Sequence, residues 1–252
     1  MRYFLELAYS GTSYNGWQRQ PNAPSVQQTL EENLSKLLGA TIEIVGAGRT
    51  DTGVNASYYV AHFDSVREIS DCKDFCYHLN SMLPFDIAVY RVYEVSDSAH
   101  ARFDAISREY RYHIILGKDP FRKHVAWQYY GALDVEAMNT AAEHLLINED
   151  FTSFAKLNSN NHTNICHVSH ARWERVGESE LVFTIRANRF LRNMVRAIVG
   201  TLVDVGRGKI TSERFGEIVR ARDLSLSSAS APAAGLFLTD VEYPETIKQQ
   251  NN

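Results

Sequence analysis

The pattern of hydrophobic and polar positions in the N-terminal half changes between a period of two and the period of a helix. A strand is predicted at residues 3–8, because apolar side chains recur there at every second position. A helix is predicted over residues 26–39, where apolar residues share one face, and Ser25 with Gln28 predicts a capping box at its start. The same two periods predict strands at 41–45, 58–64 and 87–95 and a helix at 70–83.

The C-terminal half continues in the same manner. Asp134 predicts the N-cap of a helix with an apolar face. Another helix is predicted over about residues 189–205, and Arg189, Arg192 and Arg196 lie along it at near-helical spacing beside an apolar stripe. The remaining predicted elements are strands at 108–116, 165–176, 181–187 and 235–243 and a helix at 211–222.

The order of these elements predicts an α+β fold. Strands and helices interleave without regular β-α-β repetition, which favours antiparallel sheets flanked by helices. With 252 residues and 44% apolar composition, the chain is long enough for two modest cores. A boundary is expected near residues 99–105, which divides the chain into an N-terminal domain, residues 1–104, and a C-terminal domain, residues 105–252.

The charge of the chain gives a mixed indication about nucleic acids. The formal net charge is −4, which taken alone argues against a polyanionic partner. Lys and Arg nevertheless exceed Asp and Glu between Arg186 and Arg222. Because the distribution of charge steers a nucleic acid more than its sum does, RNA binding stays open.

Three cysteines do not make a disulfide framework, and reduced thiols in the cytoplasm fit them better. The N-terminus shows no basic region followed by an apolar stretch, so no signal peptide is expected. No apolar run approaches the roughly 20 residues that a bilayer span needs. We therefore expect a cytoplasmic protein without a membrane partner.

Two clusters of cysteine and histidine are candidate metal sites. Cys72 and Cys76 lie four residues apart on a predicted helix, where free cysteine usually behaves as a small hydrophobic residue. In the second cluster, His167 faces away from Cys166 and His170 on a predicted strand, so that one tetrahedral site is awkward. We expect neither cluster to bind a metal.

The run from Gly46 to Gly53, Gly-Ala-Gly-Arg-Thr-Asp-Thr-Gly, follows a predicted strand and admits several interpretations. A dinucleotide fingerprint would need a third glycine where Asp51 stands and a helix after it, whereas the next segment alternates as a strand. An aspartic protease would need a second carboxylate, and the chain holds no second Asp-Thr-Gly or Asp-Ser-Gly. Only a homodimer would supply that partner.

A third interpretation depends on Arg49, two residues before Asp51. The flanking glycines let the backbone approach a ligand closely, and a guanidinium suits a phosphate or a base edge. Asp51 would then act as a nucleophile on a sugar or base held in a polyanion. An ordinary surface turn is the alternative, because Gly, Asp and Thr are common turn residues.

The run from Gly48 to Val54, Gly-Arg-Thr-Asp-Thr-Gly-Val, resembles the signature of the TruA family of tRNA pseudouridine synthases. The resemblance extends along nearly the whole chain, in separate motifs that follow the family's order. These motifs are residues 9–12, 16–20, 79–87, 100–103, 108–112, 150–154, 190–196 and 235–238. One departure is Asn55, which stands where the family often has histidine.

The resemblance implies roles for individual residues by position. Asp51 matches the catalytic aspartate, which attacks the target uridine so that the glycosidic bond breaks and the base rejoins the ribose through carbon 5. Tyr110 matches a tyrosine that packs on the flipped base, although Tyr112 shares its predicted face and either could belong to a core. Arg49 matches an arginine that holds the target nucleotide out of the stack, and Arg196 matches a basic residue that pairs with the aspartate.

The resemblance also implies the pseudouridine synthase fold, with two mixed α+β domains and an active-site cleft between them. It implies uridines 38, 39 and 40 of the tRNA anticodon stem-loop as targets, a homodimer, and no metal or cofactor. An RNA-binding module that has lost activity is the competing class of function. The intact Arg49, Asp51 and Tyr110 argue against it, because a binder has no need of a nucleophile.

Overall fold

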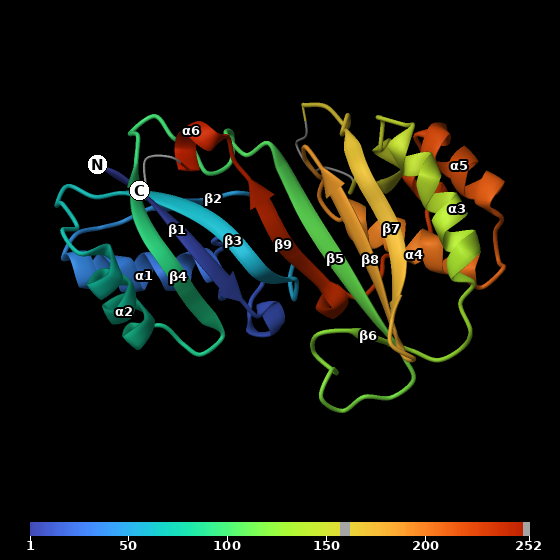
Figure 1. The fold of residues 1–252 in the computed structure, drawn as a ribbon, viewed down its shortest axis with the longest axis horizontal. Helices are drawn as coiled ribbons and strands as arrows, with labels where there is room; N and C mark the ends of the chain where they lie inside the picture. The colour runs from blue at the N-terminus through green and yellow to red at the C-terminus, as the bar shows by residue number, and fades with distance from the viewer. Residues whose placement is uncertain (157–161, 249–252) are drawn as a thin grey trace. The chain divides into compact units, whose positions relative to one another are not determined.

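The structure, a computed structural model, describes residues 1–156 and 162–248. The chain forms two compact units. The first comprises Met1–Ser107 together with the chain from Leu238 onward, and the second comprises Arg108–Phe237. The C-terminal strand of the chain thus belongs to the same unit as the N-terminus, and Figure 1 shows both units with their elements.

The strands of the first unit form an antiparallel framework around β1 (Arg2–Tyr9). This strand pairs on one side with β3 (Asn55–Asp64) and on the other with β4 (Ile87–Val95). The short β2 (Ile44–Gly46) pairs with β3, and β9 (Leu236–Glu242) also lies beside β3. One face of β1 is buried along its length by Tyr3, Leu5, Leu7 and Tyr9, and Phe4 is buried on the other face.

Two helices pack on these strands, α1 (Val26–Leu38) and α2 (Cys72–Met82) (Figure 1). Ser25 caps α1 as predicted, because its Oγ accepts a hydrogen bond from the Gln28 N–H at 3.3 Å. The Gln28 side chain bonds to Glu32 at 2.8 Å, so only the first half of the predicted capping box is confirmed. Gly39 ends α1 in the left-handed conformation, with φ of 67°.

The second unit is built on β5 (Ser107–Leu116), β8 (Glu180–Ala187) and β7 (Val168–Val176), which pair antiparallel in that order. The short β6 (Trp127–Tyr129) runs parallel to β5. The prediction of antiparallel pairing therefore holds for β1 with β3 and β4, for β2 with β3, and for β8 with β5 and β7, whereas β6 pairs parallel with β5. The fold is α+β with mixed strand pairing.

Three mutually contacting helices accompany these strands, and α3 packs directly on β7. They are α3 (Val135–Leu146), α4 (Met194–Gly206) and α5 (Ser212–Ala221). The predicted cap of α3 is confirmed, since Asp134 Oδ1 accepts from the Ala137 N–H at 3.0 Å. Short turns complete the described chain: 3-10 turns at Gly11–Ser13, Thr152–Phe154, Leu224–Leu226 and Ala233–Gly235, and α6 (Glu245–Lys248).

The predicted helix over residues 189–205 is wrong at its start, because α4 begins only at Met194. Asn193 adopts the left-handed conformation, with φ of 66°, which a continuous right-handed helix does not allow. Arg189 and Arg192 consequently precede the helix, and Arg196 alone of the three lies in it.

The predicted strand at 41–45 is also displaced, because β2 begins at Ile44. The Ile42 N–H donates to Ser35 Oγ at 2.9 Å, which holds this stretch against α1 rather than in the sheet. Among the described residues, no helix combines the length and apolar character needed to cross a bilayer.

Candidate active site

Asp51 lies in the loop between β2 and β3 of the first unit, as predicted. The Val54 N–H donates to the Asp51 carbonyl at 3.1 Å, which closes a tight turn. Gly53 occupies the left-handed region in this turn, with φ of 77°, which favours glycine. The Asp51 side chain is half-buried and Arg49 is exposed. Asp51 thus lies in a hydrogen-bonded turn with its side chain partly accessible.

The segment after β1 holds this loop from the other side. The Trp17 N–H donates to the Thr50 carbonyl at 3.4 Å, and the Gly53 N–H donates to the Tyr14 carbonyl at 3.3 Å. The hydroxyls of Tyr9 and Thr50 are hydrogen-bonded at 2.9 Å. Backbone hydrogen bonds on both sides of Asp51 therefore fix the position of its Cα. Residues 16–20 and 48–54, two of the motifs that resemble the family, thus lie in contact.

Two glycines allow the backbones to come this close. A Cβ on Gly11 would collide with the Val54 carbonyl, and one on Gly16 would collide with the Thr50 carbonyl. Gly16 also has φ of 87°. Both glycines are therefore required by the approach of the N-terminal segment to the Asp51 loop.

Trp17 anchors the loop rather than offering a surface to a ligand. Its side chain is 2% exposed, and its ring stacks on Tyr59 with centroids 4.1 Å apart. The Tyr59 hydroxyl donates to the Gly48 carbonyl. A Cβ on Gly46 would collide with both rings, which explains the glycine that ends β2. The stacked pair of Trp17 and Tyr59 therefore contacts the first residues of the loop, at Gly46 and Gly48.

Asn55 connects the loop to the N-terminal segment. It is 1% exposed, and its Oδ1 accepts a hydrogen bond from the Gly11 N–H at 2.8 Å. A buried backbone N–H without a partner is destabilising, so Asn55 satisfies a group that the close approach has removed from water. The residue that departs from the family's frequent histidine thus has a local structural role here.

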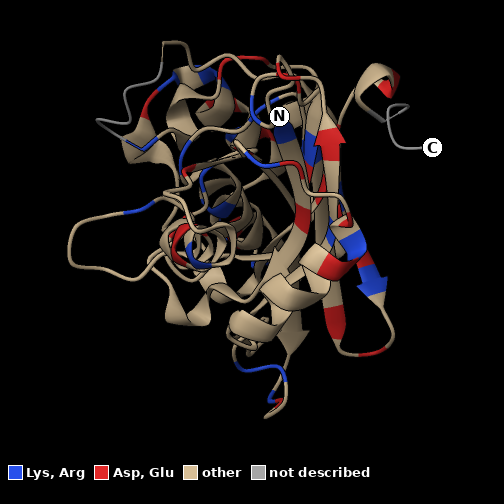
Figure 2. Ribbon diagram, turned by 90° about the vertical axis from the view of Figure 1, so that its left-hand side faces the viewer, with Lys and Arg blue, Asp and Glu red and all other residues tan. Residues whose placement is uncertain are grey.

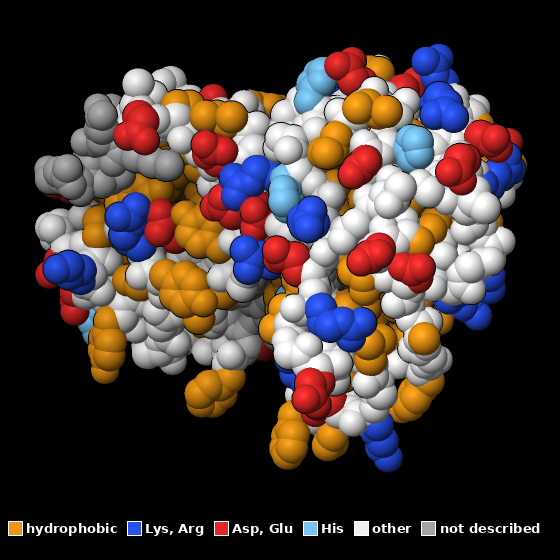
Figure 3. All heavy atoms as spheres, turned by 45° about the vertical axis from the view of Figure 1, so that its right-hand side comes forward, with side chains coloured by type: hydrophobic (Ala, Val, Ile, Leu, Met, Phe, Trp, Pro, Cys, Tyr) orange, Lys and Arg blue, Asp and Glu red, His pale blue; other side chains and the backbone are white. Residues whose placement is uncertain are grey.

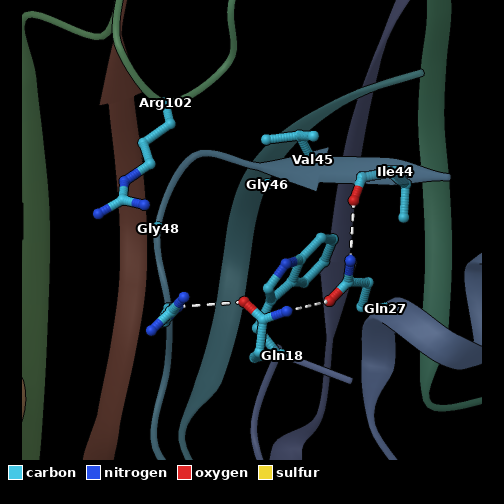
Figure 4. A pocket seen from close by; sticks show the side chains of 9 residues that line it. Gln18, Gln27, Ile44, Val45, Gly46, Gly48 and Arg102 are labelled. Atoms are coloured by element: carbon cyan, nitrogen blue, oxygen red, sulfur yellow. Dashed lines mark hydrogen bonds between the residues drawn. The ribbon is translucent and has the colours of Figure 1, made fainter. Parts of the chain in front are cut away.

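Arg49 lies at the edge of a small cavity of about 150 Å³ in the first unit. Its Nε donates to Gln18 Oε1 at 3.1 Å. Arg102 also lines the cavity, and Figure 4 shows Gln18 and Gln27 adjacent within it, with Gln27 directed at the Ile44 carbonyl. Two guanidinium groups and two amides are hydrogen-bonding groups suited to RNA.

In the second unit, the two tyrosines that share a face of β5 have different surroundings. Tyr112 is 0% exposed, its hydroxyl donates to the Pro232 carbonyl at 2.7 Å, and burial raises its pKa. Tyr110 is only half-buried, and its ring meets Phe190 edge to face with centroids 5.1 Å apart. Tyr112 is therefore a core residue, whereas part of the Tyr110 ring remains accessible.

Arg196 lies in the first turn of α4, half-buried. Its Nε donates to the Ala231 carbonyl at 2.8 Å, and its own carbonyl accepts from the Ala231 N–H at 2.9 Å. These two bonds tie the start of α4 to the segment before β9. Arg196 is thus held by its backbone and by one edge of its guanidinium.

The basic excess between Arg186 and Arg222 is largely balanced locally. Among the described residues, the side chains in this stretch that form ion pairs with carboxylates include Arg186, Arg207, Lys209, Arg214 and Arg222. On the face in Figure 3, Lys and Arg side chains are interspersed with Asp and Glu, and Figure 2 shows the same mixture along the strands in view. The charge pattern alone does not identify an RNA-binding surface.

The three cysteines are free thiols. Cys166 is fully buried, and burial raises its pKa to about 11. His167 Nδ1 lies 3.3 Å from Glu149 Oε1. Within residues 1–156 and 162–248, no three potential metal ligands gather into a site.

The chain matches a family model described as tRNA pseudouridine synthase over residues 7–104 and 141–244. Arg49, Asp51 and Arg196 fall within the matched ranges, and Tyr110 falls between them. The chain is 53% identical over 248 residues to the tRNA pseudouridine synthase A of Bacteroides thetaiotaomicron, covering 98% of this chain and 92% of that protein.

Two further relatives carry the same description. The protein of Parabacteroides distasonis is 50% identical over 246 residues, with 98% of this chain and 97% of the relative covered. The protein of Colwellia psychrerythraea is 41% identical over 252 residues, with 98% and 96% covered. Since the family model and these nearly full-length relatives agree, the chain belongs to the TruA family of tRNA pseudouridine synthases and is an isomerase.

Proposed function

We propose that this enzyme converts uridines 38, 39 and 40 of the tRNA anticodon stem-loop to pseudouridine, with Asp51 as its nucleophile. The observation that carries the proposal is the fixed presentation of Asp51. The residues on both sides of this half-buried carboxylate are hydrogen-bonded to the segment after β1. A nucleophile held in this way loses little freedom when it reacts.

The proposed reaction balances without a co-reactant. The Asp51 carboxylate attacks the target nucleotide, the bond between N1 of the base and C1′ of the ribose breaks, and the base turns. A new bond forms between C5 and C1′, the bond between Asp51 and the nucleotide breaks and returns the free carboxylate, and the proton on C5 is lost while N1 gains one. Pseudouridine is an isomer of uridine, so no oxidant, reductant or water is consumed.

Three further residues are proposed to contact the target nucleotide. The accessible part of the Tyr110 ring would stack on the extruded base. Arg49 would occupy the gap that the base leaves, which offsets part of the few kcal/mol that extrusion costs. Arg196, whose Nε donates to the Ala231 carbonyl, would supply positive charge beside the Asp51 carboxylate.

The experiment compares wild type with Asp51→Ala on uridine-labelled tRNA. We expect wild type to form pseudouridine, and Asp51→Ala to form none while it still binds tRNA. Asp97→Ala is a matched control, because Asp97 is a carboxylate of the same unit whose side chain is 84% exposed. Equal pseudouridine formation by wild type and Asp51→Ala would contradict the role of Asp51.

Transfer RNA as the substrate would place the enzyme in the cytoplasm, and we propose that it acts there as a homodimer. Sedimentation at about twice the chain mass of 28.6 kDa would support the dimer, and sedimentation as a single chain would contradict it.

A further inference from the structure

A chain of hydrogen bonds runs from the interior of the first unit to Arg49. Arg49 Nε donates to Gln18 Oε1 at 3.1 Å, and Gln18 Nε2 donates to Gln27 Oε1 at 3.0 Å. Gln27 Nε2 then donates to Glu31 Oε1 at 3.1 Å. Four side chains from the Asp51 loop, the segment after β1 and α1 are thus connected in series.

The inner end of the chain is firmly anchored. Glu31 is 6% exposed, and its Oε1 also accepts from the Ile44 N–H at 3.2 Å. Its Oε2 accepts from Arg19 Nη1 at 3.1 Å. Gln27 Nε2 makes a second bond, to the Ile44 carbonyl at 2.9 Å. Helix α1 and strand β2 therefore hold Glu31 and Gln27 together.

The anchored carboxylate sets the direction of every bond in the chain. An ionised carboxylate only accepts hydrogen bonds, so Gln27 must turn its amide nitrogen toward Glu31. Its oxygen then faces Gln18 and also accepts from the Arg19 N–H at 2.9 Å. Gln18 must accordingly offer nitrogen to Gln27 and oxygen to Arg49. A guanidinium only donates hydrogen bonds, so Gln18 Oε1 is the acceptor that Arg49 Nε requires.

The contact engages one edge of an exposed side chain. Because Gln18 binds Nε, bidentate recognition of a phosphate or base edge would use Nη1 and Nη2 of Arg49. A long side chain on a surface otherwise loses rotamer freedom when it binds, and an existing hydrogen bond reduces that loss. Arg49 lines the same cavity as Gln18 and Gln27, and Figure 4 shows the two glutamines within it.

We propose that Gln18 and Gln27 are positioning residues that orient Arg49 for the target nucleotide during pseudouridine formation. The proposal rests on the function proposed above, since it assigns a support to Arg49 in that reaction. Neither glutamine contacts the reacting atoms in this scheme, and both act through the orientation of the Arg49 guanidinium.

A double-mutant cycle tests the proposal in the full-length enzyme. Single-turnover rates of pseudouridine formation and tRNA affinities are measured for wild type, Gln18→Ala, Arg49→Ala and the double variant. We expect Gln18→Ala to slow the reaction about tenfold, as fits one lost hydrogen bond to a charged group. In the Arg49→Ala background the same change should slow it less than about twofold, because its effect is transmitted through Arg49.

A second variant and a control separate this role from a general loss of structure. Gln27→Leu keeps the size of the side chain and removes the amide, so we expect it to slow the reaction. In the Arg49→Ala background this effect of Gln27→Leu should also disappear. Gln28→Ala is the matched control, because Gln28 forms the equivalent pair with Glu32 four residues on, exposed to solvent, at 2.8 Å. Its rate should equal that of wild type.

Two results would overturn the proposal: an unchanged rate in Gln18→Ala, or rate losses that multiply fully with those of Arg49→Ala. Multiplied losses would mean that Gln18 acts independently of Arg49. If instead wild type forms no pseudouridine at all, the proposed function itself fails. An active wild type that depends on Asp51, with independent effects of Gln18 and Arg49, would remove only this inference.

Discussion

At the scale of single residues, the site depends on two glycines, whose lack of a Cβ allows close backbone contacts, as well as on its polar side chains. Gly11 and Gly16 let two backbones approach within hydrogen-bonding distance, and Asn55 satisfies the Gly11 N–H that becomes buried there. None of these three residues carries reactive chemistry. They determine where the backbone of the Asp51 turn lies.

Gly16→Ala should therefore destabilise the first unit and lower turnover. Its Cβ would collide with the Thr50 carbonyl and lie 3.1 Å from the Asp51 carbonyl carbon, in a backbone conformation that disfavours alanine. We expect the free energy of unfolding, measured by urea denaturation, to decrease by about 2–3 kcal/mol.

Gly48→Ala is the matched control for stability in the same loop. No atom lies within 4 Å of a Cβ at Gly48, and its φ is outside the left-handed region. Its free energy of unfolding should stay within about 0.5 kcal/mol of wild type. Equal destabilisation by the two substitutions would show that the close approach at Gly16 is not what matters.

At the scale of elements, β3 connects the Asp51 loop to the chain that leaves β4. His62 of β3 is 4% exposed, and its Nδ1 accepts from the Ala101 N–H at 3.0 Å, which requires the neutral ring. Burial, followed by the nearby charges of Arg2 and His100, lowers the pKa of His62 to about 4. The unfolded chain has the ordinary value of 6.5.

The stability of the fold should consequently depend on pH through His62. Between pH 6.5 and about 4 the unfolded state binds more protons than the folded state, so the free energy of unfolding falls as the pH falls. The stabilisation is complete above pH 6.5, and its loss amounts to at most about 3 kcal/mol.

Urea denaturation of wild type and His62→Gln from pH 7.5 down to about 4.5 measures this effect. The glutamine oxygen can accept from the Ala101 N–H but does not titrate in this range. We expect a shallower pH dependence in the variant. Identical slopes in the two proteins would assign the effect to other groups.

At the scale of the whole molecule, charge is distributed rather than concentrated. The formal net charge is −4, and ion pairs use many of the basic side chains. We therefore expect tRNA to be bound through a limited number of phosphate contacts. Each contact releases counterions, so the affinity still depends on salt.

We expect tRNA affinity to fall at least about tenfold between 50 and 200 mM salt, as a few neutralised phosphates would produce. Binding is measured by fluorescence anisotropy with a labelled anticodon stem-loop. Arg49→Ala should weaken binding and reduce the slope of log affinity against log salt. Affinity that is independent of salt would contradict phosphate contacts altogether.

Local sequence determined most elements of the fold and the place of the candidate nucleophile. Alternation and helical periodicity predicted β1, β4 and α1, because each is stabilised by burial of one repeating face. Caps such as Ser25 act within one turn and can be read locally. The Asp51 turn lies between two strands, as the local pattern predicts.

The tertiary structure decided what depends on residues distant in the sequence. The start of α4 at Met194, the pairing of the C-terminal β9 beside β3, and the contrast between Tyr110 and Tyr112 have no local signal. The spacing of Gln27 and Glu31 predicts that they pair on one face of a helix. The hydrogen bonds that continue from Gln27 through Gln18 to Arg49 cannot be predicted from that spacing. Periodicity reports which faces are buried, whereas only the packed backbones bring Gly16, Gln18 and Asp51 together.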